Sequence, residues 1–194
     1  PKAIAIPGQV AGMGLAHDTF ATKSWADLLA PAIALADAGL PVDWYAQLIL
    51  GGSAKDLAPF PASAKTFLDE SGFPKASGWT ALGETKCDLS RLAASLRTVA
   101  ENGPRAFYEG PLAQSIIDDL QATGGRHSMA DMADYQATLV DAMHYPYRDH
   151  EIIATPTLTA GPTMRRALEI MSEWHPASAT PDAEAFVTYD RAIR

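Results

Sequence analysis

Alanine is the most abundant residue of this chain, at 36 of 194 positions, whereas aromatic residues make up only 8%. Alanine has the strongest intrinsic preference for the α-helix. Hydrophobic residues at 47% and charged residues at 20% are near the averages of globular proteins, so wholesale disorder and fibrous folds are excluded. The composition therefore predicts a folded chain built mainly of closely packed helices.

Charge and cysteine content exclude several classes of function. A formal net charge of −8 argues against nucleic acid or an anionic membrane as a partner. No run of residues approaches the roughly 20 apolar residues of a membrane span. The single cysteine, Cys87, excludes an intrachain disulfide and a multi-cysteine zinc site, and we interpret it as an incidental thiol.

Hydrophobic spacing and capping residues predict about nine helices. Ser24 is the expected N-cap of a helix that Gly39 ends, and Pro31 either kinks that helix or begins a new one. Gly51 and Gly52 are expected to end a short helix, and residues 53–87 are expected to be rich in loops. The helices are predicted at residues 10–20, 24–38, 43–50, 63–68, 88–101, 111–122, 128–135 and 163–174, and from 182 onward.

Extended segments are few. Lys2–Ile6 reads as a short strand, and residues 138–147 and 151–154 are expected to form an antiparallel hairpin that turns near Arg148 and Asp149. The predicted fold class is thus mainly α with a small antiparallel β-hairpin (α+β), with residues 1–194 forming one helix-rich segment. Within it, we expect the following side chains to be buried: Leu28, Ile33, Leu35, Leu92, Leu96, Phe107, Ile116 and Ile117.

The spacing of the histidines and of the acidic pairs matches no established catalytic motif. The histidines His17, His127, His144, His150 and His175 form no metal-binding spacing. An independent hydrolase that uses His144 or His150 with Asp149 is one hypothesis. The acidic pairs are expected to be solvated surface; they are Asp69 with Glu70 and Asp118 with Asp119. No cofactor is predicted.

A hydroxyl-rich loop surrounds Gly161 and Pro162 and contains Thr155, Thr157, Thr159 and Thr163. Such a loop before a helix can hold an anion through its amides and hydroxyls. The alternative is that Thr159 or a neighbour caps the helix, and this is the interpretation we favour.

Several longer sequence motifs, taken in their order along the chain, resemble those of the γ-glutamyltransferase (γ-glutamyltranspeptidase) family. The resemblance covers nearly the whole chain, and its specificity comes from the combination of phrases. The phrases are residues 7–13 with Ala16 and His17, residues 25–36, 92–99 and 101–110, Gly124 with Gly125, and residues 128–135 and 147–152.

The resemblance implies a segment of an N-terminal-nucleophile hydrolase of αββα fold, from the later part of the large subunit of a self-cleaving precursor. In that family a threonine at the start of the small subunit attacks a γ-glutamyl amide, with its own α-amino group as base. Neither that threonine nor the family's substrate-carboxylate arginine has a counterpart here. We therefore assign no catalytic, substrate-binding or metal residue to this chain and expect it to be inactive alone.

One departure keeps alternatives open. The family often has Pro-Ser-Ser-Gly-Gly after the strand, whereas this chain has Thr157-Leu158-Thr159-Ala160-Gly161-Pro162. A relative that acts on another acyl amide, such as a cephalosporin acylase, fits as well, and a non-enzymatic helical scaffold is a further alternative. Both ends look cut, so we expect a piece of a longer polypeptide that partners the small catalytic subunit and, alone, associates with itself.

Overall fold

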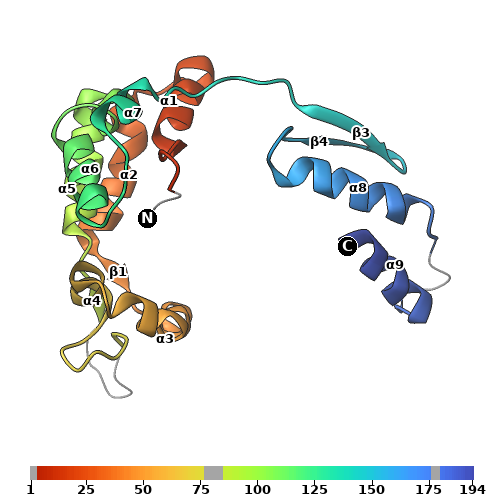
Figure 1. Ribbon diagram of the computed structural model, residues 1–194, viewed down its shortest axis with the longest axis horizontal. Helices are drawn as coiled ribbons and strands as arrows, with labels where there is room; N and C mark the ends of the chain where they lie inside the picture. The colour runs from red at the N-terminus through yellow and green to blue at the C-terminus, as the bar shows by residue number, and fades with distance from the viewer. Residues whose placement is uncertain (1–3, 77–84, 176–179) are drawn as a thin grey trace. The chain divides into compact units, whose positions relative to one another are not determined.

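The computed structural model describes residues 4–76, 85–175 and 180–194, and its chain divides into two compact units between Ala137 and Thr138 (Figure 1). Unit 1 is residues 1–137 and unit 2 is residues 138–194. Both are mostly helical with small antiparallel sheets, as the sequence predicts. Unit 1 contains α1 (Gln9–Phe20), α2 (Trp25–Ala38), β1 (Leu40–Pro41), α3 (Trp44–Leu57), α4 (Pro61–Phe67), β2 (Lys86–Cys87), α5 (Ser90–Asn102), the 3₁₀ turn η1 (Pro104–Phe107), α6 (Pro111–Ala122) and α7 (Met129–Asp134).

Unit 2 contains the predicted hairpin and two helices. Its elements are β3 (Met143–Tyr147), β4 (His150–Ala154), α8 (Ala160–Ser172) and α9 (Ala183–Ile193). The strands are antiparallel, with register running from Met143 opposite Ala154 to Tyr147 opposite His150. The hairpin is confirmed, although its first strand begins at Met143 and residues 138–142 are not in a strand.

Several helix limits agree with the sequence prediction. α6 has the predicted bounds, and Ser128 caps α7 in a capping box with Asp131. Ser24 caps α2 by accepting from the Asp27 amide. α2 continues through Pro31, so the alternative in which a second helix begins at that proline is wrong.

The predicted stop at Gly51 and Gly52 is also wrong, because α3 runs on to Leu57. A glycine inside a helix costs about 1 kcal/mol relative to alanine. That cost is offset by packing, since Leu50 belongs to a cluster with Val42 and Cys87, and Leu57 packs against it. Residues 53–57 are therefore helical where loop was expected, whereas α4 (Pro61–Phe67) confirms the helix predicted near residues 63–68.

The predicted strand at Lys2–Ile6 is not formed in its described part, because residues 4–6 have no regular structure. The remainder of that prediction, residues 2 and 3, lies outside the described residues. A short antiparallel pair was missed instead: Leu40 lies opposite Cys87 and Pro41 opposite Lys86. Two-residue strands 46 positions apart leave no periodic pattern that a sequence could show.

α2 and α5 pack side by side through small residues. Ala36, Ala93 and Val99 are the buried positions of these two helices. The Trp25 indole N–H donates to the Val99 carbonyl at 2.9 Å, and an Arg97–Asp37 ion pair joins the same helices at the surface. The alanine content thus serves close helix packing, as the composition suggests.

The predicted core is only partly correct. Ile117 is buried, and Ile33, Leu96, Phe107 and Ile116 are half-buried. Three of the predicted core leucines are exposed: Leu28 at 47%, Leu35 at 72% and Leu92 at 49%. The apolar stripes are wider than the contact between α2 and α5, because that contact is made by alanines.

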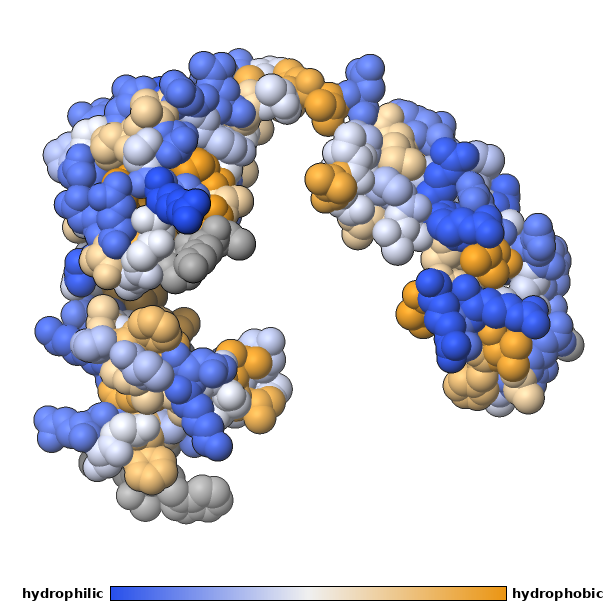
Figure 2. Space-filling model, viewed as in Figure 1, coloured by the Kyte–Doolittle hydropathy of each residue, from blue (hydrophilic) through white to orange (hydrophobic). Residues whose placement is uncertain are grey.

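Unit 1 has two buried clusters: the one around Leu50 and Cys87, and a second where α6, α7 and η1 meet. The buried residues of the second cluster are Tyr108, Ala113, Ile117 and Met132. In unit 2, α8 packs on β3 and α9, and the buried residues of the described part are Tyr145, Gly161 and Ala185. Large hydrophobic side chains remain on the surface of each unit, as the orange residues in Figure 2 show.

Candidate functional site

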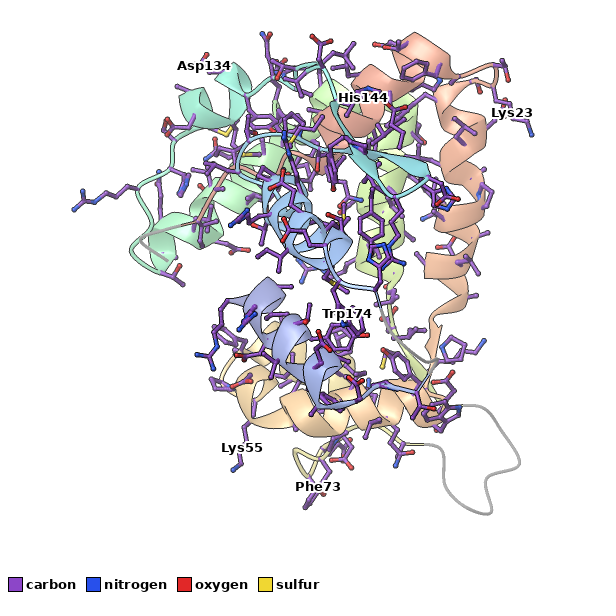
Figure 3. The ribbon with its side chains drawn as sticks, turned by 90° about the vertical axis from the view of Figure 1, so that its right-hand side faces the viewer. Lys23, Lys55, Phe73, Asp134, His144 and Trp174 are labelled. Atoms are coloured by element: carbon purple, nitrogen blue, oxygen red, sulfur yellow. The ribbon has the colours of Figure 1, made fainter. Side chains whose placement is uncertain are left out.

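The hairpin separates the two histidines of the hydrolase hypothesis. Cross-strand partners share a face of a sheet, and faces alternate along each strand. His144 pairs with Ile153 and shares its face, whereas His150 pairs with Tyr147, on the face that also carries buried Tyr145. His144 lies on β3 in Figure 3.

Each histidine has a separate acidic neighbour. His144 Nδ1 lies 3.2 Å from Glu151 Oε1, and His150 Nε2 lies 3.4 Å from Asp149 Oδ1. All four side chains are more than half exposed. A general acid or base must be held within hydrogen-bond reach of a bound substrate. These exposed pairs show no such positioning, so the geometry gives no support to an independent hydrolase here.

The threonine loop is occupied by its own hydrogen bonds. Thr159 Oγ1 accepts from the Gly161 amide at 3.2 Å and from the Thr155 hydroxyl at 3.0 Å, and it donates to the Thr155 carbonyl at 2.8 Å. Thr159 is therefore the N-cap of α8, which confirms the capping interpretation. A β-carbon on Gly161 would fall 1.9 Å from the Thr155 carbonyl oxygen, so the loop is closed against the helix.

The acidic pairs lie at the surface, as predicted, because Asp69, Glu70, Asp118 and Asp119 are all exposed. Asp69 Oδ1 accepts from the amides of Ser71 and Phe73 and so stabilises a turn. Asp118 accepts from Gln114 one helical turn earlier, and both Asp118 and Asp119 are exposed.

Cys87 is completely buried, and burial raises the pKa of its thiol. A raised pKa disfavours the reactive thiolate. In residues 4–76, 85–175 and 180–194, no three side chains of the types His, Cys, Asp and Glu gather closely enough to hold a metal ion. None of the helices in the described part of the chain combines the length and hydropathy of a bilayer crossing.

Tyr108 brings together three of the sequence motifs that carry the family resemblance. Its hydroxyl donates to the Pro7 carbonyl at 2.7 Å and accepts from the Ala11 amide at 3.0 Å, at the first turn of α1. Burial raises the pKa of Tyr108, so the hydroxyl keeps the proton that it donates. The ring stacks on Tyr135 with centroids 5.6 Å apart. Residues 7–13, 101–110 and 128–135 thus meet at one tyrosine.

Two glycines of α1 and its N-cap permit this approach. A β-carbon on Gly8 would lie 2.1 Å from the Tyr135 hydroxyl oxygen, and one on Gly14 would lie 2.6 Å from Pro104 Cγ. Such distances are far inside van der Waals contact. Only residues without a side chain let α1 lie so close to η1 and to the end of α7.

Arg105 fastens α7 to η1. Its guanidinium donates to the carbonyls of Ala133 at 2.7 Å and Tyr135 at 2.9 Å, and it pairs with Glu109. A cation at the carboxyl end of a helix satisfies carbonyls that have no partner within the helix. The phrase Gly-Pro-Arg-Ala-Phe-Tyr therefore organises packing and presents no reactive group to solvent.

An apolar groove of about 840 Å³ runs over unit 1, between α1, α2 and α5. Of the described residues that line it, none is Asp, Glu, Lys or Arg, and the polar ones are Gln9, His17 and Ser95. Leu28 on α2 and Leu92 on α5, predicted to be core residues, line the groove and remain about half exposed. Sequence reasoning found these residues but missed the groove, because it took an apolar stripe as evidence of burial.

The walls of the groove are fixed in place. The Tyr108 hydroxyl holds α1 to η1, and the Trp25 indole holds α2 to α5. His17 lies edge-on to Trp25, with ring centroids 5.4 Å apart, and its Nε2 lies 3.0 Å from the Lys23 carbonyl oxygen. The shape of the groove is thus set by hydrogen bonds that do not involve a ligand.

The fold is that of transpeptidases and acylases. The structure matches the crystal structure of Helicobacter pylori γ-glutamyltranspeptidase with a TM-score of 0.84 and 23% identity, over 96% of this chain and 52% of that one. It matches the cephalosporin acylase of Bacillus halodurans with a TM-score of 0.81 and 22% identity, over 96% of this chain and 34% of that one. At these identities the similarity establishes the fold alone.

The family model described as γ-glutamyltranspeptidase matches residues 1–192, and the chain belongs to this family. Curated relatives include the acylase ACY 1 proenzyme of Pseudomonas sp. (strain V22), 36% identical over 155 residues, and the glutathione hydrolase proenzyme of Escherichia coli (strain K12), 30% identical over 155 residues. Each alignment covers 80% of this chain and 26% of the relative. The chain thus spans about a quarter of the length of these relatives.

Proposed function

We propose that the chain is a segment of the large subunit of a γ-glutamyltransferase-like precursor. The complete enzyme would cleave γ-glutamyl amides and transfer the acyl group to water or to an amino acid. The observation that carries this proposal is the match of the family model to residues 1–192.

The chemistry would follow from a terminal threonine outside this chain. Its hydroxyl adds to the amide carbonyl while its α-amino group takes the proton, and the amine then leaves with a proton as the acyl ester forms. Water or an acceptor amine resolves that ester and restores the threonine. Amide donors near the nucleophile stabilise the oxyanion of each tetrahedral intermediate.

Residues 1–194 would contribute scaffold rather than reacting groups. This role is supported by the phrases that carry the family resemblance, because Tyr108, Arg105 and the glycines of α1 make packing contacts. It is also supported by the histidine–acid pairs of the hairpin, because all four of their side chains are more than half exposed. We assign no catalytic, substrate-binding or metal residue to the chain.

The proposal is tested with a γ-glutamyl anilide, whose hydrolysis releases a coloured amine. The full-length gene product is expected to hydrolyse it, and the purified 194-residue chain is expected to be silent. Hydrolysis by the purified chain would show that it carries its own nucleophile. Sequencing the rest of the reading frame provides the control, because a non-enzymatic scaffold needs no threonine at a cleavage point.

An acylase is the second candidate function. Identity is higher with the Pseudomonas acylase proenzyme, at 36%, than with the Escherichia coli glutathione hydrolase proenzyme, at 30%. The loop from Thr157 to Pro162 also departs from the phrase common in the transpeptidases. A full-length product that cleaves the acyl side chain of a cephalosporin faster than the γ-glutamyl anilide would favour this candidate.

We further propose that the chain pairs with the small subunit of the same precursor and that, in isolation, it associates with itself. The support is the number of large hydrophobic side chains left exposed, including Phe20, Trp44, Leu35 and Phe186. Contiguous apolar surface favours association. Light scattering that shows a monomer at high concentration would refute the self-association.

A further inference from the structure

The groove between α1, α2 and α5 is open and uncharged. Met13 on α1, Leu28 on α2 and Leu92 on α5 are 59%, 47% and 49% exposed, respectively. A pocket for a small ligand buries most of the ligand surface, and its lining is correspondingly enclosed. A groove whose walls stay half open to water is suited to a polypeptide segment instead.

The lack of charge indicates a permanent partner. In a chain with 20% charged residues, the described lining of this groove contains no carboxylate, ammonium or guanidinium group. Transient interfaces are about as polar as the rest of a protein surface, whereas permanent ones resemble a divided core. The groove therefore fits an apolar segment that stays in place once bound.

Shape argues against a second copy of this groove as the occupant. A two-fold interface places the same patch on both partners, so the patch must be complementary to itself. A concave groove of about 840 Å³ is not complementary to another concave groove. The occupant must be convex and must come from a different surface.

The length of the relatives indicates where such a segment resides. About three quarters of the Pseudomonas and Escherichia coli proenzymes lies outside the region matched to this chain. We propose that the groove is the docking surface for an uncharged, apolar segment of the same precursor outside residues 1–194. The inference rests on the proposed function only in taking the chain as part of a longer precursor.

The groove is preorganised for this role. Its walls are fixed by the Trp25–Val99 and Tyr108–Pro7 hydrogen bonds, so docking does not have to order them. Preorganised surfaces bind more tightly because less conformational freedom is lost. The half-exposed leucines are then core residues of the complete protein, which explains why their spacing predicts burial.

The test is chemical protection in the full-length gene product. Cysteines are introduced at two exposed groove positions on different helices, by Met13→Cys and Leu92→Cys, and their reaction with a maleimide is timed. Native Cys87 is buried, and the unsubstituted protein gives its background rate. Ser71→Cys, at an exposed polar turn away from the groove, is the matched control.

In the dilute 194-residue chain, all three introduced cysteines are expected to react readily. In the full-length product the two groove cysteines should react at least about tenfold more slowly, while the cysteine of Ser71→Cys keeps its rate. Equal rates in both proteins would overturn the proposal. Protection that develops in the short chain as its concentration rises, and not in the full-length product, would make a second copy the occupant and would also overturn it.

The γ-glutamyl anilide assay on the same samples separates the two proposals. A full-length product that protects the groove but hydrolyses no anilide refutes the proposed activity and leaves the docking surface standing. A product that hydrolyses the anilide but leaves the groove unprotected supports the proposed activity and refutes the docking surface. Circular dichroism on each variant verifies that a changed rate does not come from unfolding.

Discussion

The two units bury their side chains to very different extents. Among described residues, unit 1 has eleven buried hydrophobic residues in 137 positions, whereas unit 2 has Tyr145 and Ala185 in 57 positions. Long-range packing therefore stabilises unit 1, through contacts that join segments far apart in the sequence. Unit 2 depends on local order: a hairpin register, the Thr159 cap and ion pairs one turn apart, such as Arg165 with Glu169. A small unit with so little core is marginal by itself.

One buried tyrosine in each unit makes the contrast concrete. The Tyr108 hydroxyl in unit 1 has two hydrogen-bond partners. The Tyr145 hydroxyl in unit 2 is buried and meets no partner within the described residues. An unsatisfied buried polar group costs free energy, whereas a satisfied one contributes a little. A buried tyrosine hydroxyl thus stabilises unit 1 and destabilises unit 2.

The largest expected change in stability comes from removing the Tyr108 hydroxyl, with the Tyr145 hydroxyl as the comparison. Tyr108→Phe leaves the Pro7 carbonyl and the Ala11 amide without their partner and should destabilise unit 1 by about 3 kcal/mol. Tyr145→Phe removes an unpaired group and should leave unit 2 unchanged or more stable. Hydrogen exchange, measured in each unit as a function of urea concentration, gives the change in unfolding free energy for both variants. A loss of stability from Tyr145→Phe equal to that from Tyr108→Phe would break the contrast.

A smaller effect is expected from two glycines of α1. Gly14→Ala forces a methyl group against the stiff ring of Pro104 and should cost about 2 kcal/mol. Gly12→Ala, in the same helix with nothing within 4 Å, should stabilise it by up to about 1 kcal/mol, because alanine is the better helix former. If α1 packs as described, the two variants shift the thermal unfolding midpoint in opposite directions. Two shifts of the same sign would contradict that packing.

The cap of α8 should matter less. Thr159→Ala removes the side-chain acceptor of the Gly161 amide and should destabilise unit 2 by about 1 kcal/mol. Thr163→Ala, at an exposed position of the same helix, is the control and should change little. Hydrogen exchange in the first turn of α8 is the measurement. If both substitutions accelerate exchange equally, Thr159 does not act as the cap.

The smallest effect concerns pH and the capping box of α7. Hydrogen bonds from the Ser128 side chain and amide lower the pKa of Asp131 from its ordinary range, and nearby His127 adds to this. Because the folded pKa is the lower one, this stabilisation is present above about pH 4 and is lost as pH falls through the folded value. The difference in urea midpoint between the protein and Asp131→Asn should shrink between pH 6 and 3, taken as rough limits of the window. A difference that does not change with pH would exclude the ionised box.

The sequence predicts best those elements whose signals are local. The bounds of α6, the Ser128 cap and the β3–β4 hairpin all follow from residues within one or two turns of each other. The short β1–β2 pair and the passage of α3 through Gly51 and Gly52 do not, because they depend on the distant cluster around Cys87. Tertiary packing overrides helix propensity at those glycines.

For the candidate surface, the sequence identifies the apolar residues but not which of them face one another. Leu28 and Leu92 have the spacing of core residues, and a stripe alone does not say whether its partner lies inside this chain. The groove is defined only when α1, α2 and α5 are placed together. The Tyr108 contacts could likewise not be predicted, because no local sequence pattern links Pro7 to a residue 101 positions later.

That separation also orders events during synthesis. The hydroxyl that satisfies the first turn of α1 leaves the ribosome about a hundred residues after the helix itself, at roughly 5–20 residues per second. For several seconds α1 therefore has an incomplete N-terminus and an uncovered face. Until Tyr108 has been synthesised, the Ala11 amide at the first turn of α1 therefore depends on water for its hydrogen bond.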